Sequence, residues 1–123
     1  MRIGGSKAAA ICGISPWETP LEAYMAIVED RQIPENEPMY WGKKLEPLVR
    51  EKYAEVTGRQ VVYNDDPKKY GVEFQHPKYN FIYGSLDGVS HKTGVDNRVL
   101  EIKTARSRDA WVDGVPEYYQ CQI

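Results

Sequence analysis

The hydrophobic period of this chain changes at Gly58, and that change limits the fold more than any other feature. Before Gly58, one apolar stripe recurs at helical spacing, made of Trp41, Leu45, Leu48, Val49, Tyr53 and Val56. After Gly58, short runs of residues have the composition of strands, and the clearest of them is Val99-Leu-Glu-Ile-Lys-Thr104. The chain therefore predicts helices followed by strands, in an α/β or α+β domain.

Local signals divide the first half into three helices. Ser6 can cap a helix over Lys7–Cys12 that Gly13 closes, and Thr19-Pro20 can start a helix over Leu21–Val28. Residues 30–38 contain two prolines and predict a loop. The third helix carries the apolar stripe, contains Pro47 and ends at Gly58.

The second half predicts four short strands before a last helix. The candidate strands are residues 59–63, 72–75, 81–90 (in two pieces, 81–83 and 85–90) and 99–104, with turns at 64–67 and 91–94. Residues 105–113 predict a short helix or loop, and Pro116 opens a helix that stops at Ile123. Because that helix stops in its second turn, we expect a single domain over residues 1–123 that is truncated at its C-terminus.

Composition excludes several classes of protein. The 123 residues are 41% hydrophobic and 28% charged, which is ordinary for a globular domain, and no apolar run reaches the roughly 20 residues of a membrane span. Two cysteines form neither a metal-binding spacing nor a disulfide framework, so we expect a reduced protein of the cytoplasm. The net charge of −2 predicts that any nucleic-acid contact is local.

Asp87, Glu101 and Lys103 form the pattern that points to chemistry. Side chains two apart on a strand face the same way, so Glu101 and Lys103 share a face, and a hairpin through residues 91–97 brings Asp87 beside Glu101. Two carboxylates with a lysine suit metal-dependent cleavage of a phosphodiester. The alternative is structural: Asp-Gly is a common turn, and Glu-x-Lys on a strand is often an ion pair.

The sequence resembles the YqaJ-like viral recombinase family, relatives of phage lambda exonuclease among the PD-(D/E)xK nucleases. Five segments in order carry the resemblance: residues 3–22, Gly42-Lys-Lys-Leu-Glu-Pro47, Ser85-Leu-Asp-Gly-Val89, Leu100-Glu-Ile-Lys-Thr104 and Val115-Pro-Glu-Tyr-Tyr-Gln-Cys-Gln122. The resemblance implies a restriction-endonuclease-like core, in which a mixed sheet is flanked by helices.

The resemblance also implies roles for single residues. Glu46, Asp87 and Glu101, with the backbone carbonyl of Ile102, would hold two Mg²⁺ ions, for which Mn²⁺ would substitute. Lys103 would be the catalytic lysine, and Gln122 would support the lysine and the attacking water. On the residues alone, Glu46 could equally be a surface charge, and Gln120 competes with Gln122.

Contacts to DNA follow in part from the same resemblance and in part from residue type. Ser6, with Arg2 as a possible partner, would bind the 5′-terminal phosphate of a strand, although Ser6 could equally be a plain helix cap. Candidate backbone contacts are Lys43, Lys44, Arg50, Arg106 and Arg108. Candidates for stacking on an unpaired base are Trp17, Trp41, Tyr83 and Trp111, of which we expect Trp41 to be core.

The function implied is a magnesium-dependent DNA exonuclease of phage-type recombination. It would resect linear duplex DNA from 5′ to 3′ for a single-strand annealing protein, in the cytoplasm of a bacterial host and away from membranes. Relatives form trimers, which makes a homo-oligomer an expectation. Two alternatives stay open: a structure-selective or restriction-like endonuclease on the same core, and a DNA-binding fragment without nuclease activity.

Overall fold

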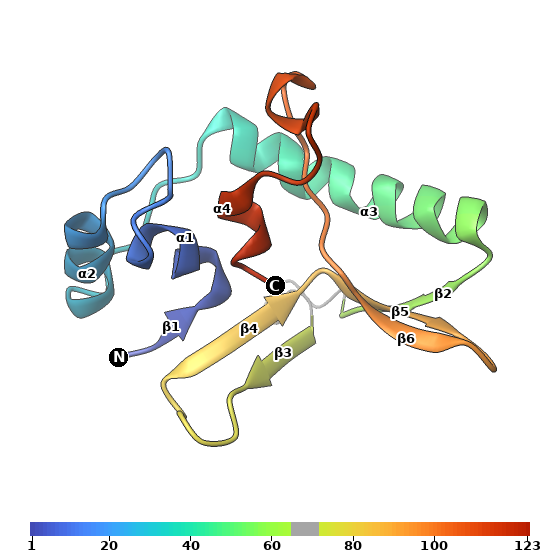
Figure 1. The fold of residues 1–123 in the computed structure, drawn as a ribbon, viewed down its shortest axis with the longest axis horizontal. Helices are drawn as coiled ribbons and strands as arrows, with labels where there is room; N and C mark the ends of the chain where they lie inside the picture. The colour runs from blue at the N-terminus through green and yellow to red at the C-terminus, as the bar shows by residue number, and fades with distance from the viewer. Residues whose placement is uncertain (65–71) are drawn as a thin grey trace. The chain divides into compact units, whose positions relative to one another are not determined.

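Helices precede most of the strands in the computed structural model, which describes residues 1–64 and 72–123. The helices are α1 (Ala8–Ile11), α2 (Pro20–Val28), α3 (Glu37–Thr57) and α4 (Glu117–Gln120), with 3-10 turns at Gly5–Lys7 and Asp109–Trp111. The strands are β1 (Ile3–Gly4), β2 (Gln60–Val62), β3 (Val72–Gln75), β4 (Ile82–Leu86), β5 (Gly88–Lys92) and β6 (Asp96–Leu100) (Figure 1). This order confirms the mixed α/β class. Most of the turn predicted at 64–67 lies outside the described residues.

The strands form two small sheets. One has the order β1-β4-β3 and the other the order β2-β5-β6, in which both pairs are antiparallel. Strand β1 is parallel to β4, whereas β3 and β4 run in opposite directions, so the first sheet is mixed (Figure 1). The sequence did not predict β1, because two residues are too few to show an alternating pattern. Within the described residues, no helix is both long and apolar enough to cross a membrane.

The chain divides into two compact units. The first unit contains residues 1–33, 74–84 and 106–123, and the second contains residues 34–73 and 85–105. Helices α1, α2 and α4 belong to the first unit, and α3, β2, β5 and β6 belong to the second. The single domain expected over residues 1–123 stays a prediction.

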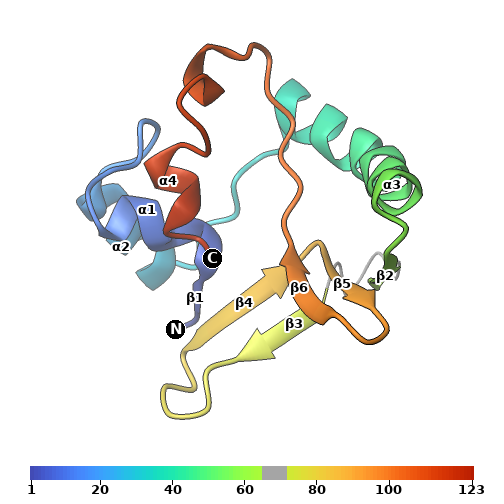
Figure 2. The same cartoon turned by 45° about the vertical axis from the view of Figure 1, so that its right-hand side comes forward.

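Small side chains let the helices of the first unit approach one another. Helix α1 contacts α2 and α4, as Figure 1 and Figure 2 both show, and Ala9, Ala10 and Ala23 are buried. Helix α2 starts where the sequence predicted: Thr19 Oγ1 accepts a bond from the Glu22 N–H, and the Glu22 carboxylate accepts one from the Thr19 N–H.

The predicted role of Ser6 as a helix cap is wrong. Ser6 lies inside the 3-10 turn Gly5–Lys7, and no side chain caps that turn or α1. Because the helical segments there are so short, they offer no extended helix dipole. Any anion site at Ser6 must therefore depend on side chains and on local N–H groups.

Helix α3 starts earlier than its apolar stripe suggested, inside the predicted loop 30–38. Asn36 Oδ1 accepts a bond from the Met39 N–H at 3.0 Å, and Pro38 suits the first turn, so the helix begins at Glu37. It ends as predicted, with Gly58 in the left-handed conformation at φ 64°.

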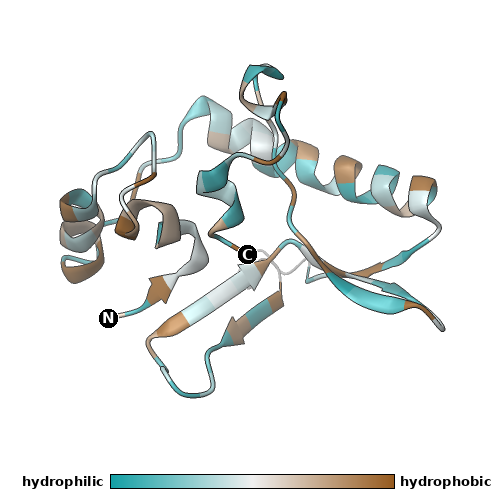
Figure 3. Ribbon diagram, in the orientation of Figure 1, coloured by the Kyte–Doolittle hydropathy of each residue, from teal (hydrophilic) through white to brown (hydrophobic). Residues whose placement is uncertain are grey.

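The apolar stripe of α3 is not the face turned inward. Hydrophobic positions recur along α3 (Figure 3), yet Trp41, Leu48 and Val56 are 54%, 62% and 71% exposed, so the expectation that Trp41 is core is wrong. The more buried positions share another, largely polar face made of Gly42, Glu46, Arg50, Tyr53, Ala54 and Thr57, and Tyr53 is its one residue from the stripe. This polar face meets polar groups of the sheet, as in the 2.9 Å contact between the Tyr53 hydroxyl and Ser90 Oγ.

Strand β6 ends at Leu100, so the predicted strand over 99–104 is wrong beyond that residue. Its partner β5 begins at Gly88, which lies opposite Leu100, and the ladder has no residue of β5 to pair with Glu101. The predicted stretch 81–90 is interrupted at Asp87, between β4 and β5, and not at Gly84 as predicted.

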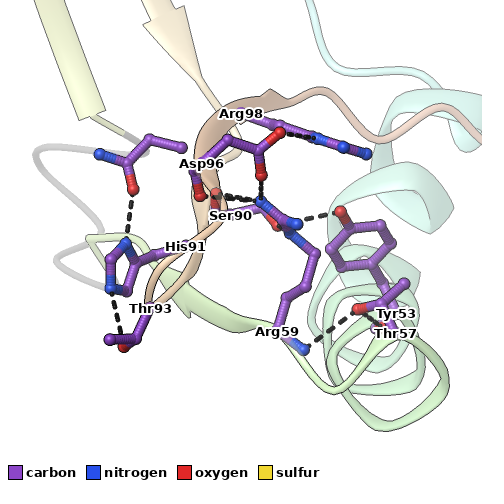
Figure 4. A network of polar contacts seen from close by, with 9 residues as sticks. Tyr53, Thr57, Arg59, Ser90, His91, Thr93, Asp96 and Arg98 are labelled. Atoms are coloured by element: carbon purple, nitrogen blue, oxygen red, sulfur yellow. Dashed lines mark hydrogen bonds and ion pairs between the residues drawn. The ribbon is translucent and has the colours of Figure 1, made fainter.

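A buried arginine fixes the other end of this hairpin (Figure 4). Arg59 is 7% exposed and donates to Ser90 Oγ at 2.7 Å, to the Asp96 carbonyl at 3.0 Å and to the Asp96 carboxylate. Since Ser90 lies on β5 and Asp96 begins β6, these bonds tie the two strands together where the turn between them starts.

Candidate active site

Asp87 lies in the short connection between β4 and β5 and faces the chain that leaves β6. The register places Gly88 opposite Leu100, so Asp87 and Glu101 are adjacent, as predicted. Asp87 Oδ2 accepts a bond from the Ile102 N–H at 2.6 Å. A carboxylate thus takes the place of a strand partner at the end of the ladder and holds residues 101–103 in position.

Gly88 is needed for this turn. A Cβ at Gly88 would lie 2.8 Å from Val61 Cγ1, closer than side chains approach. The Asp-Gly pair therefore reflects close packing of β5 on β2 as well as the turn itself.

Glu101 and Lys103 lie together, as their spacing predicted. Lys103 Nζ is 2.5 Å from Glu101 Oε1, and the two side chains are 26% and 10% exposed.

Glu46 reaches the same site from α3, with its side chain only 12% exposed. Glu46 is therefore not a surface charge, the alternative that the residues alone left open. Burial raises the pKa of Glu46 above its ordinary value, and the negative charge of Asp87 raises it further, with a smaller effect from Glu101. The ion pair with Arg50 opposes this rise. Asp87 and Glu101 are therefore near enough to repel the Glu46 carboxylate.

Arg50 belongs to this cluster and not to a DNA-facing surface. Its side chain is 8% exposed, it pairs with Glu46, and its Nε donates to the Asp87 carbonyl at 3.2 Å. The prediction that Arg50 contacts the DNA backbone is therefore wrong. The signal in the sequence was its position four residues after Glu46, on the same face of the helix.

The donors at this site fit a hard divalent cation by chemistry and by charge. Three carboxylates face two cations, Arg50 and Lys103, which leaves a negative excess, and carboxylate and carbonyl oxygens are the ligands that Mg²⁺ prefers. In residues 1–64 and 72–123, no three acidic, histidine or cysteine side chains are close enough to share one ion. The three carboxylates would have to move closer to one another to bind the same ion.

The remaining predicted site residues are divided between the two units. Gln122, Ser6, Arg2 and Arg106 belong to the first unit, whereas the acidic residues and Lys103 belong to the second. The competitor Gln120 donates from Nε2 to the Val115 carbonyl at 2.6 Å, a bond within its own segment.

A cation-lined cavity of about 760 Å³ lies in the first unit. It is lined by the predicted phosphate contacts Arg2 and Ser6, and also by Lys7, Arg31 and Tyr83. The Arg2 guanidinium stacks on the Tyr83 ring at 4.1 Å. Lys7 pairs with Glu18 at 2.7 Å, and Arg31 pairs with Glu29. Neither Lys7, which lies inside the first motif segment (residues 3–22), nor Arg31, which lies in no motif, was among the predicted phosphate contacts.

Two of the predicted backbone contacts are on the exposed surface of α3. Lys43 Nζ pairs with Glu35 at 2.7 Å, and Lys44 lies 5.5 Å from the centre of the Tyr40 ring. Three of the predicted stacking aromatics lie in the first unit, where Trp111 stacks on Tyr119 and Trp17, 69% exposed, meets Tyr118 edge-on.

Comparisons with known proteins show the family of this chain. The model of the YqaJ-like viral recombinase domain matches residues 1–123, and the chain belongs to that family. The chain is 31% identical, over 98% of its length, to the uncharacterized protein YqaJ of Bacillus subtilis (strain 168), of which it covers 37%.

Two solved structures share the fold. They are LHK-Exo in complex with dAMP (TM-score 0.71) and the alkaline exonuclease LHK-Exo from Laribacter hongkongensis (TM-score 0.69). Both are 24% identical to this chain, over 98% of its length, and the chain covers 60% and 59% of them. The fold is therefore restriction-endonuclease-like, as predicted, and the chain spans well under two thirds of the proteins it matches.

Proposed function

We propose that this chain is the nuclease domain of a metal-dependent DNA exonuclease of phage-type recombination, acting on linear duplex DNA from 5′ to 3′. The observation that carries the proposal is the meeting of Asp87, Glu101 and Lys103 at the end of the β5–β6 ladder. Membership of the YqaJ-like family and the fold shared with an alkaline exonuclease support it.

Under this proposal the acidic cluster holds Mg²⁺ through Asp87, Glu101 and the Ile102 carbonyl, with Glu46 as a further ligand for a second ion. Bound divalent ions neutralise the phosphate and lower the pKa of water. Lys103 orients the attacking water, and the bond from Ile102 N–H to Asp87 keeps the lysine on the side of the carboxylates. Gln122 supports the water and the lysine, a role that rests on the family resemblance.

The cavity in the first unit suits a terminal phosphate. Arg2, Lys7 and Arg31 line it together with one acidic residue, Asp30, while Glu18 and Glu29 pair with Lys7 and Arg31. The Ser6 hydroxyl can also donate to an anion. We assign this cavity to the 5′ end of the degraded strand. That one of the similar structures holds dAMP supports a deoxynucleotide as the released product. An annealing protein as partner and a trimeric assembly rest on the resemblance alone.

The test compares linear duplex with covalently closed circular DNA in the presence of Mg²⁺. We expect mononucleotides from the linear substrate and an intact circle, with no release by Asp87→Asn and normal release by Asp113→Asn, a change at an exposed aspartate of the other unit. A cut circle would show an endonuclease instead. Binding of DNA ends without release under any metal would show a binding module.

A further inference from the structure

Arg50 contacts three groups in the second unit at once. Its guanidinium pairs with the Glu46 carboxylate and donates from Nε to the Asp87 carbonyl at 3.2 Å. The same group lies over the Tyr63 ring, with Cζ 4.1 Å from the ring centre. The side chain is 8% exposed, so these contacts are made largely out of water.

These contacts connect two elements that supply acidic residues. Glu46 comes from α3, and Asp87 from the connection between β4 and β5. A guanidinium is planar and presents its donors in a rigid fork, so bonds from one Arg50 to both elements fix their spacing. The Tyr63 ring holds the plane of the fork from one side.

We propose that Arg50 is a positioning residue of the nuclease site, which sets Glu46 at the distance from Asp87 that metal binding needs. The inference rests on the metal-dependent function proposed above. Arg50 neither holds the ion nor touches DNA in this role; it acts by holding Glu46 in place relative to the backbone at Asp87.

Arg59 offers a matched control, because it is a second buried arginine of the same unit. It bonds to Ser90 and Asp96, at the end of the hairpin away from Asp87 and Glu101. A purely structural role for Arg50 would make Arg50→Lys and Arg59→Lys behave alike. Both variants keep the positive charge and lose the rigid fork.

The experiment measures Mn²⁺ affinity of the whole chain by titration calorimetry, at a temperature below the unfolding of every variant. Loss of a residue that orients a metal ligand typically weakens metal binding about tenfold to a hundredfold. We expect that loss for Arg50→Lys and a change of less than about threefold for Arg59→Lys. In a Glu46→Gln background, Arg50→Lys should add less than about threefold, since its effect passes through Glu46.

Each outcome decides between clear alternatives. If the wild-type chain binds Mn²⁺ and Arg50→Lys binds it equally well, the inference on Arg50 is overturned while the nuclease proposal stands. If the wild-type chain does not bind Mn²⁺, the metal site and the inference fall together. If Arg50→Lys does not fold by circular dichroism, Tyr63→Leu replaces it, and unchanged Mn²⁺ affinity in that variant overturns the role of Arg50.

Discussion

At Lys103 the catalytic and the structural interpretations of the Glu101-Ile-Lys103 pattern predict different results. Lys103→Ala should lose a hundredfold or more of the cleavage rate, because a positioned group that handles the proton of water contributes about 10²–10⁴-fold. Mn²⁺ binding and most DNA affinity should remain, since the carboxylates are intact. Rates of nucleotide release, calorimetric Mn²⁺ titration and DNA binding by fluorescence anisotropy measure the three effects.

The control for Lys103→Ala is Lys52→Ala, which removes an exposed lysine that pairs with Glu55 at 3.0 Å. That variant should cleave like the wild-type chain. Cleavage by Lys103→Ala at a similar rate would leave only an ion pair between Glu101 and Lys103.

Asp87 links metal binding to stability. Asp87 and Glu101 repel the Glu46 carboxylate, so an ion that binds only the folded chain should raise its melting temperature. At a hundred times the dissociation constant the gain is about 2.7 kcal/mol, or about 10 °C for a chain of this length. Asp87→Asn keeps an oxygen for the Ile102 N–H but loses the charge. Adding the ion should therefore not shift the melting curve of this variant.

Calorimetric scans with and without millimolar Mg²⁺ or Mn²⁺ measure this linkage, and Asp113→Asn serves as the control that keeps the shift. A shift of equal size in Asp87→Asn would place the ion elsewhere. A wild-type curve that neither ion moves would contradict the metal site itself.

The positions of Asp87, Glu101 and Lys103 could be predicted from the sequence. The position of Arg50, beside Glu46 and Asp87, could not. A side-chain period of two and a short hairpin suffice to bring Asp87 beside Glu101 and to place Lys103 on the same side. The position of Arg50 depends on which face of α3 is buried. The apolar stripe concealed that face, because surface positions of this helix are more hydrophobic than buried ones.

Among the elements, the start of α2 and the end of α3 followed the sequence, whereas the end of β6 did not. Thr19 marks the start of α2 by local hydrogen bonds, and Gly58 marks the end of α3 by its backbone conformation. Both residues are recognisable in the sequence as helix-end signals. The end of β6 depends on where β5 begins, and the start of β5 depends on the space beside Val61 that only Gly88 fits. Pairing of this kind is set by residues far away in the chain.

The stability of the β5–β6 hairpin should depend on pH through Asp96. Hydrogen bonds from Arg98 and Arg59 hold the pKa of Asp96 below its ordinary value. A carboxyl with a lowered pKa in the folded state stabilises the fold above its unfolded pKa, near 3.9, and loses that contribution as the pH falls through its folded pKa. Asp96→Asn should therefore unfold at lower urea than the wild-type chain at pH 7.

This difference in urea midpoint should shrink below about pH 4, where the wild-type Asp96 takes up a proton. The control is Asp113→Asn, at an exposed position, which should track the wild-type chain throughout. A gap that stays constant from pH 7 to pH 3 would mean that Asp96 contributes through packing and not through its charge.

At the scale of the whole molecule, the predicted site residues are shared between the two units. The second unit holds the acidic cluster with Lys103, and the first holds Gln122 and the cavity with Ser6 and Arg2. The family motifs run through both units, so the resemblance could predict every member of this set. It could not predict that Lys7 and Arg31 line the cavity, because they come together only when the first unit folds.

The cavity of the first unit leads to a prediction on the end of the substrate. If Ser6 and the cations around it bind a terminal phosphate, 5′-phosphorylated linear duplex should be degraded faster than 5′-hydroxyl duplex. A hydrogen bond to a charged group contributes about 1.5–3 kcal/mol, which corresponds to about a tenfold to hundredfold preference. Ser6→Ala and Arg2→Met should each narrow this preference, whereas Ser107→Ala, at an exposed serine of the same unit, should leave it unchanged. Initial rates on the two substrates measure this preference. Equal rates would contradict phosphate binding in the cavity and favour an endonuclease, which needs no DNA end.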